Sequence, residues 1–133
     1  HLLGAVAELR AHRPSLHREL LGRIATASEA FAEALLGLDT AGALQAVAMQ
    51  AAAMAALGMA AGLPIVTDEH AAIARLAATN GGVAKPSGAG GGDLAVALFE
   101  TVAQAHAFEA ACMERELILV FAPLGAPGVQ THR

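Results

Sequence analysis

The sequence predicts an α+β fold in which helices pack on one face of a small antiparallel sheet. The first eighty residues space their apolar side chains as helices do, whereas residues 81–121 hold short β-prone runs, a glycine-rich segment and one more helix. Of the 133 residues, 56% are hydrophobic and 15% are charged, which excludes a disordered chain. We expect one domain over residues 1–133, with a helical part at 1–80, a sheet part at 81–121 and a turn-rich tail at 122–133.

Four helices are expected in the helical part. The first begins near Leu2 and stops near Pro14, and Ser15 is the expected N-cap of the second. Gly37 followed by Asp39 and Thr40 marks a stop and the cap of the third helix, and Thr67 is the expected cap of the fourth. Apolar residues at helical spacing should line the inner faces of the second and third helices. These are Leu16, Leu20, Ile24, Ala27, Phe31 and Leu35, and then Leu44, Val47, Ala51, Met54 and Gly58.

The segment from Thr40 to Val66 carries no formal charge, so its length and apolar character also suit a membrane span. It contains glutamines and glycines, is dominated by alanine, and has no basic or aromatic girdle beside it. We therefore expect a buried helix of a soluble protein and no membrane partner.

Composition also limits partners and compartment. The net charge is −4 without a run of lysine or arginine, which argues against a nucleic-acid partner. Platforms for stacking single-stranded bases are missing too, since Trp and Tyr are absent and only four Phe occur. The single cysteine, Cys112, excludes an internal disulfide and favours a cytoplasmic location.

The sheet part is expected to run strand, loop, strand, helix, strand. Gly82–Lys85 and the alternating Leu94–Leu98 flank the loop, and Leu117–Phe121 is the closing strand. Between the last two strands, a helix should run from about Glu100 to Arg115. Its inward face should carry Val102, Ala105, Phe108 and Cys112.

The loop between the first two strands is the one segment with evident chemistry. Its glycines leave room for a close ligand and let successive N–H groups point inward around an anion, usually a phosphate. Lys85 would add a charge and the Ser87 hydroxyl a donor. A structural turn stays the alternative, because glycine motifs alone are weak signals. The candidate site residues are Lys85, Ser87, Gly88, Ala89, Gly90, Gly91, Gly92 and Asp93.

Other polar residues are assigned mainly structural roles. Asp93 would tie down the loop through backbone N–H groups or, in the alternative, orient water or Mg²⁺. The six histidines form no pair with metal-ligand spacing, so we expect surface or partly buried histidines and no metal site. Asp68 and Glu69 should stabilise the start of the fourth helix through its dipole.

The string from Ala84 to Asp93, followed by an apolar strand, resembles the third motif of the GHMP kinases. Its Ser-Gly-Ala-Gly-Gly-Gly-Asp part is most similar to phosphomevalonate kinases, with mevalonate kinase as second choice, although Leu94 replaces the cysteine usual there. The resemblance covers most of the chain. It implies a ferredoxin-like C-terminal lobe whose first strand would precede His1, which leaves a sheet edge unpaired.

This resemblance implies an enzyme that transfers the γ-phosphoryl group of ATP, with Mg²⁺, to 5-phosphomevalonate, an isoprenoid precursor. The family's ATP-phosphate loop and N-terminal catalytic residues do not occur here, so the chain alone should be inactive and should hold neither ATP nor Mg²⁺. Its implied partners are the N-terminal kinase lobe and a small phosphorylated substrate. The residues from Ser87 to Gly92 would line the substrate-phosphate and γ-phosphate region.

Three alternatives stay open at this stage. The chain could be the lobe of mevalonate kinase or another GHMP kinase, a stand-alone anion-binding module, or a homo-oligomer joined through the unpaired sheet edge or the apolar helices.

Overall fold

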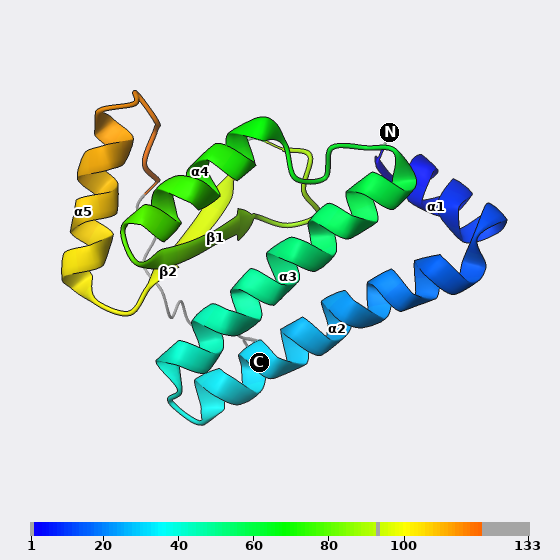
Figure 1. Cartoon of the computed structure of the whole chain (residues 1–133), viewed down its shortest axis with the longest axis horizontal. Coiled ribbons are helices and arrows are strands. Elements are labelled where there is room, and N and C mark those ends of the chain that lie inside the picture. The colour runs from blue at the N-terminus through cyan, green and yellow to red at the C-terminus, as the bar shows by residue number, and fades with distance from the viewer. Residues whose placement is uncertain (1, 93, 121–133) are drawn as a thin grey trace, which may run out of the picture.

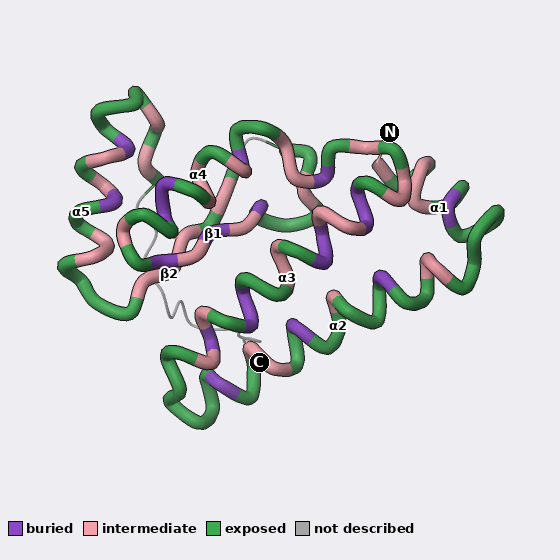
Figure 2. The backbone as a smooth tube through the Cα atoms, in the orientation of Figure 1, coloured by how far each residue is buried: buried purple, intermediate pink, exposed green. Residues whose placement is uncertain are grey.

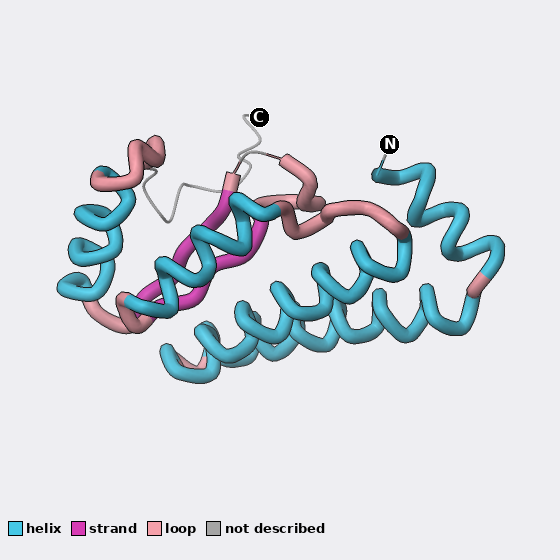
Figure 3. The backbone as a smooth tube through the Cα atoms, turned by 45° about the horizontal axis from the view of Figure 1, so that its top comes forward, coloured by secondary structure: helices cyan, strands magenta, loops and turns pink. Residues whose placement is uncertain are grey.

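The computed structural model describes residues 2–92 and 94–120 and has the predicted α+β architecture. The helices are α1 (Leu2–His12), α2 (Pro14–Leu36), α3 (Thr40–Ala61), α4 (Asp68–Thr79) and α5 (Val102–Met113), and the strands are β1 (Gly82–Pro86) and β2 (Ala95–Phe99). The long helices α2 and α3 form an antiparallel pair, strand β1 of the hairpin lies beside α3, and α4 packs on the hairpin (Figure 1). A second view agrees that α1 and α5 stand at opposite ends of the molecule (Figure 3).

Three helices begin at side-chain caps. The Asp39 carboxylate accepts a hydrogen bond from the Gly42 backbone N–H at 2.9 Å, and Thr67 caps α4, as the sequence predicts for both. Thr101 caps α5 in the same way as Thr67 caps α4. Such caps satisfy N–H groups that have no partner inside the helix, so they mark helix starts reliably.

Helix α2 begins differently from the prediction. Arg13 occupies the N-cap position, and its carbonyl accepts the His17 N–H at 3.0 Å. Pro14 is the first helical residue, and Ser15, the expected cap, already lies inside the helix. Proline suits this place because its ring presets the helical φ angle and no N–H donor is needed there.

The chain folds back on itself where α3 ends. Gly62 adopts a left-handed conformation with φ of 67°, and the next residue, Leu63, donates its N–H to the Gly58 carbonyl at 2.9 Å. Gly58 permits this close return, since a Cβ there would lie 2.6 Å from the Leu63 carbonyl oxygen. The return places Ile65, only 2% exposed, against the inner core.

Two hydrophobic clusters hold the fold, and buried positions recur along the whole of α3 (Figure 2). The cluster around α1, α2 and α3 contains Leu9, Leu20, Met54, Leu57 and Ile65. The cluster under the hairpin contains Leu76, Ala77, Ala84, Phe108 and Cys112. The predicted inner residues Phe108 and Cys112 are confirmed, whereas Val102 is 71% exposed because it is the first residue of α5. Leu35 is also more exposed than predicted, at 55%.

The described sheet has two antiparallel strands. Ala84 lies opposite Ala97 and packs in the cluster under the hairpin, while Lys85 lies opposite Val96 on the other face. Because side chains alternate along a strand, Ala84, Ala97 and Phe99 share the face toward this cluster, and Val96 and Leu98 share the opposite face.

The closing strand predicted over Leu117–Phe121 is wrong for residues 117–120, which form no strand, and Phe121 lies outside the described residues. Alternation persists, since Leu117 and Leu119 pack on the cluster under the hairpin while Ile118 is 92% exposed. An apolar pattern alone makes no strand, because a ladder needs a neighbouring backbone to bond with. Within residues 2–92 and 94–120, the predicted three-stranded sheet is therefore a hairpin.

Helix α3 is long and apolar enough to cross a membrane by length and composition. In the fold it contacts α1, α2 and β1. A helix buried in a soluble core and a membrane helix share this composition, so the absence of a membrane partner and the cytoplasmic location stay predictions.

Candidate functional site

The glycine loop, residues 87–94, connects β1 to β2. Its neck is closed by the Ser87 N–H, which donates to the Leu94 carbonyl at 2.9 Å. Gly88, Gly90 and Gly91 have φ angles of 68°, 84° and 66°, a region that residues with a Cβ rarely adopt. The glycines are therefore required by the path of the chain and do not merely loosen it.

One side of the loop is sealed against the return segment after α3. The Gly91 N–H donates to the Ile65 carbonyl at 2.8 Å. A Cβ on Gly90 would lie 2.5 Å from both the carbonyl oxygen and Cγ2 of Ile65, and one on Gly91 would lie 2.8 Å from Leu2 Cδ1. The loop thus packs with its backbone directly on Ile65 and α1.

The other side of the loop is open. Ser87, Gly88, Ala89 and Gly92 are exposed, and a Cβ on Gly88 or Gly92 would meet no atom within 4 Å. In the described part of the chain, the N–H groups of Gly88, Ala89, Gly90 and Gly92 have no hydrogen-bond acceptor. Several backbone donors on one short loop suit an anion with more than one oxygen.

Lys85 stands at the entrance to the loop. Its side chain is half-buried, and its ammonium group donates to the Pro86 carbonyl at 3.1 Å. This hydrogen bond holds the ammonium group against the backbone at the end of β1, and a role for Lys85 in binding stays a prediction. Asp93 lies outside the described residues, so its role stays a prediction.

A residue that the sequence reasoning did not single out holds the loop's exit. The expectation of surface or partly buried histidines is wrong for His70 on α4, which is only 3% exposed because the hairpin packs over it. Its Nε2 lies 3.0 Å from the Leu94 carbonyl oxygen. Its Nδ1 lies 3.3 Å from the Thr67 backbone nitrogen and 3.1 Å from the Thr67 hydroxyl. The signal was the Thr-x-x-His spacing, in which the side chain three residues after the cap turns back to complete a capping box.

Two titratable groups near these elements have shifted pKa values. The pKa of the Glu69 carboxyl is held below its usual value by its own backbone N–H and by Thr67, at the start of α4. Burial raises the pKa of the Cys112 thiol, and the opposing effect of the Arg115 charge is smaller. Among the residues that the structure describes, no three His, Cys, Asp or Glu side chains gather to hold a metal ion.

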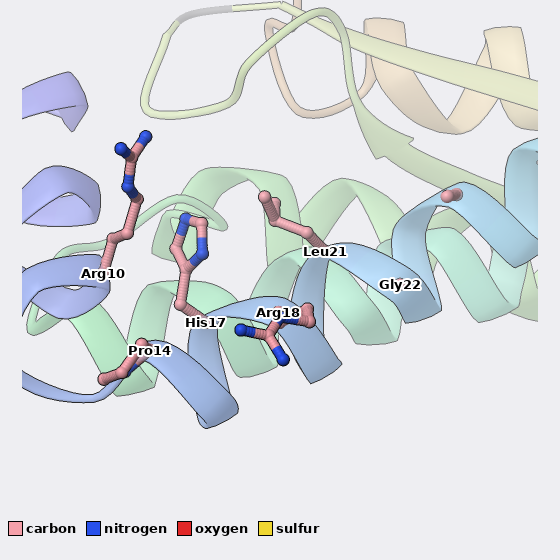
Figure 4. Close-up of a pocket in the computed structure, with 7 residues that line it drawn as sticks. Arg10, Pro14, His17, Arg18, Leu21 and Gly22 are labelled. Carbon is pink, nitrogen blue, oxygen red and sulfur yellow. The ribbon is translucent and has the colours of Figure 1, made fainter.

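A separate surface groove with about 630 Å³ of free space lies along α2 and the end of α1. Arg10 and His17 extend from its lining toward the same side, whereas Arg18 turns another way (Figure 4). The sequence reasoning gave this groove no role, and its basic side chains are spread along an exposed surface.

Comparison with known proteins gives one informative likeness. No family model matches the chain, and no curated protein matches it. A solved structure described as a Lin0012 protein from Listeria innocua superposes with a TM-score of 0.81 at 22% identity, over 86% of this chain. The match spans about a third, 32%, of that protein's chain. At this identity the likeness shows the fold alone.

Proposed function

We propose that the glycine loop binds phosphate oxygens and that the chain is the phosphate-binding lobe of a GHMP-type kinase resembling phosphomevalonate kinase. The observation that carries the proposal is the loop itself. A segment that resembles the motif of that family joins two strands, has three glycines with positive φ, and contains backbone N–H groups without an acceptor in the described part of the chain.

In this proposal the chain contributes electrostatic stabilisation. The N–H groups of Gly88, Ala89, Gly90 and Gly92 would donate to phosphate oxygens, and the Lys85 ammonium would add a full charge beside them. Phosphoryl transfer spreads negative charge over the equatorial oxygens, so donors fixed in advance lower its barrier. The open space at Gly88 and Gly92 lets a phosphate approach the backbone.

The intact enzyme would use ATP and Mg²⁺. The loop's donors fit phosphate groups, whether of the nucleotide or of the acceptor. We assign no Mg²⁺ ligand to residues 2–92 or 94–120, because no suitable side chains gather there. In this proposal the nucleotide loop and the catalytic residues would come from an N-terminal lobe.

An ADP-release assay tests the kinase proposal. The chain is mixed with Mg-ATP and with mevalonate or 5-phosphomevalonate in separate reactions, with and without the upstream lobe added in trans. We expect turnover only with that lobe and 5-phosphomevalonate. Turnover with mevalonate alone would favour mevalonate kinase, and no turnover in a folded, reconstituted pair would favour a stand-alone anion-binding module.

A titration with inorganic pyrophosphate tests the loop separately. Binding is measured from the NMR shifts of the loop amide resonances. Replacement of both Gly90 and Gly91 by Val should abolish binding, because side chains there would collide with Ile65 and Leu2. The matched control replaces Gly4 and Gly22 by Val, where a Cβ meets no atom within 4 Å. Binding that survives the loop substitutions would remove the loop's proposed role.

A further inference from the structure

The imidazole of His70 joins the start of α4 to the exit of the glycine loop. The Leu94 carbonyl accepts from two donors, the Ser87 N–H at 2.9 Å and, at 3.0 Å, the His70 ring. One carbonyl oxygen thus fixes both the closure of the loop's neck and its attachment to α4.

The partners of the ring determine its protonation state. A carbonyl oxygen can only accept, so the hydrogen must lie on Nε2 where His70 faces Leu94. Nδ1 must then be the acceptor for the Thr67 N–H and hydroxyl. The ring is neutral in this arrangement, and both of its nitrogens are used although the residue is buried.

Within the described residues, the loop makes only one other hydrogen bond to a different part of the fold. The Gly91 N–H bonds to the Ile65 carbonyl on the return segment. Ile65 therefore anchors the middle of the loop and His70 anchors its end. Without the second anchor, the Leu94 carbonyl would keep only its hydrogen bond to the Ser87 N–H, and the loop's exit would no longer be attached to α4. The open donors of Gly88 and Ala89 would then lose their fixed spacing.

From this geometry we propose that His70 is a positioning residue, which holds the glycine loop in the shape that accepts a phosphate group. The proposal rests on the proposed function of the loop. His70 does not touch the ligand, and it acts through the Leu94 carbonyl.

Two substitutions at His70 separate positioning from simple support of the fold. His70→Leu keeps an apolar side chain of similar bulk but removes both hydrogen bonds. His70→Gln keeps a donor that can reach the Leu94 carbonyl. Gln104→Leu is the matched control, because Gln104 holds the same place in the capping box of α5 as His70 does in that of α4.

The first readout is pyrophosphate affinity, measured by titration of the loop amide resonances. We expect His70→Leu to weaken binding at least about tenfold, His70→Gln to stay within about threefold of the unchanged chain, and Gln104→Leu to bind normally. Unchanged binding by His70→Leu, or equal loss in both His70 variants, would overturn the proposal.

The second readout needs no ligand. If the unchanged chain fails to bind pyrophosphate, the proposed function is contradicted, but this readout still tests whether His70 fixes the shape of the loop. Amide hydrogen exchange at Ser87 should accelerate at least about tenfold in His70→Leu and stay unchanged in Gln104→Leu. Nitrogen chemical shifts of the ring should report a neutral imidazole with its hydrogen on Nε2. Equal exchange rates, or a hydrogen on Nδ1, would contradict the positioning role.

Discussion

A Cβ atom on Gly90 would lie 2.5 Å from the carbonyl oxygen of Ile65, so the loop and the segment after α3 meet backbone to backbone. Two elements that are 25 residues apart in the chain are shaped for each other at this point. The missing side chain of Gly90 is therefore required by this packing contact.

Gly90→Ala should lower the free energy of unfolding by about 1–3 kcal/mol, because the methyl group collides with Ile65 and φ of 84° is strained for alanine. Denaturant unfolding measures the change. The stability control is Gly92→Ala, where a Cβ meets no atom within 4 Å and φ is not in the left-handed region. Equal stability of the two variants would contradict the packing described.

Gly58→Ala should also destabilise the chain by about 1–3 kcal/mol, since its Cβ would lie 2.6 Å from the Leu63 carbonyl oxygen. By contrast, Gly22→Ala on α2 should stabilise it by about 0.5–1 kcal/mol, because that site is open and alanine favours helix. Thermal unfolding of both variants checks the opposite signs. A Gly58→Ala variant as stable as Gly22→Ala would show that the chain does not return closely after α3.

Glu69→Gln should reduce stability near neutral pH and have no such effect in acid. The pKa of Glu69 is lower in the folded chain than in the unfolded one, so its ionised form contributes stability above the unfolded value, and this contribution is lost as the pH falls through the folded value. Chemical unfolding across acid and neutral pH measures it. Glu29→Gln, in the middle of α2, is the control, and a loss at Glu69 that persists in acid would argue against the mechanism.

Cys112 should react slowly with iodoacetamide in the folded chain. The thiol is 2% exposed and burial raises its pKa, so little thiolate is accessible near neutral pH. We expect the labelling rate of the folded chain to be on the order of a hundredfold lower than the rate in denaturant. Mass spectrometry measures both rates. Rapid labelling of a chain that remains folded by circular dichroism would mean that the cluster under the hairpin opens readily.

Local signals were sufficient for most of the secondary structure. Asp39 and Thr67 cap their helices as predicted because a cap depends on atoms within a few residues. The prediction of Ser15 as a cap was wrong because Pro14 takes the first helical position, which proline favours, so the cap falls on Arg13. The loop was recognised from its glycines, three of which have positive φ.

What sequence reasoning missed depends on distant contacts. Leu117–Val120 has the alternation of a strand, but whether a strand forms is decided by a neighbouring backbone. The loop's two anchors, Ile65 and His70, precede Leu94 by more than twenty residues, and no local pattern joins them to it. His70 looked like an ordinary helical histidine until the fold brought its ring to Leu94.

The return of the chain at Gly58 has a consequence for protein engineering. The return presents the Ile65 carbonyl to the Gly91 N–H, so the loop's curvature is encoded partly in a helix that ends long before the loop begins. Grafting residues 85–93 into an unrelated hairpin would transfer the sequence of the motif without the contacts that shape the loop. A transplant that keeps the shape must also carry the end of α3 and the capped start of α4.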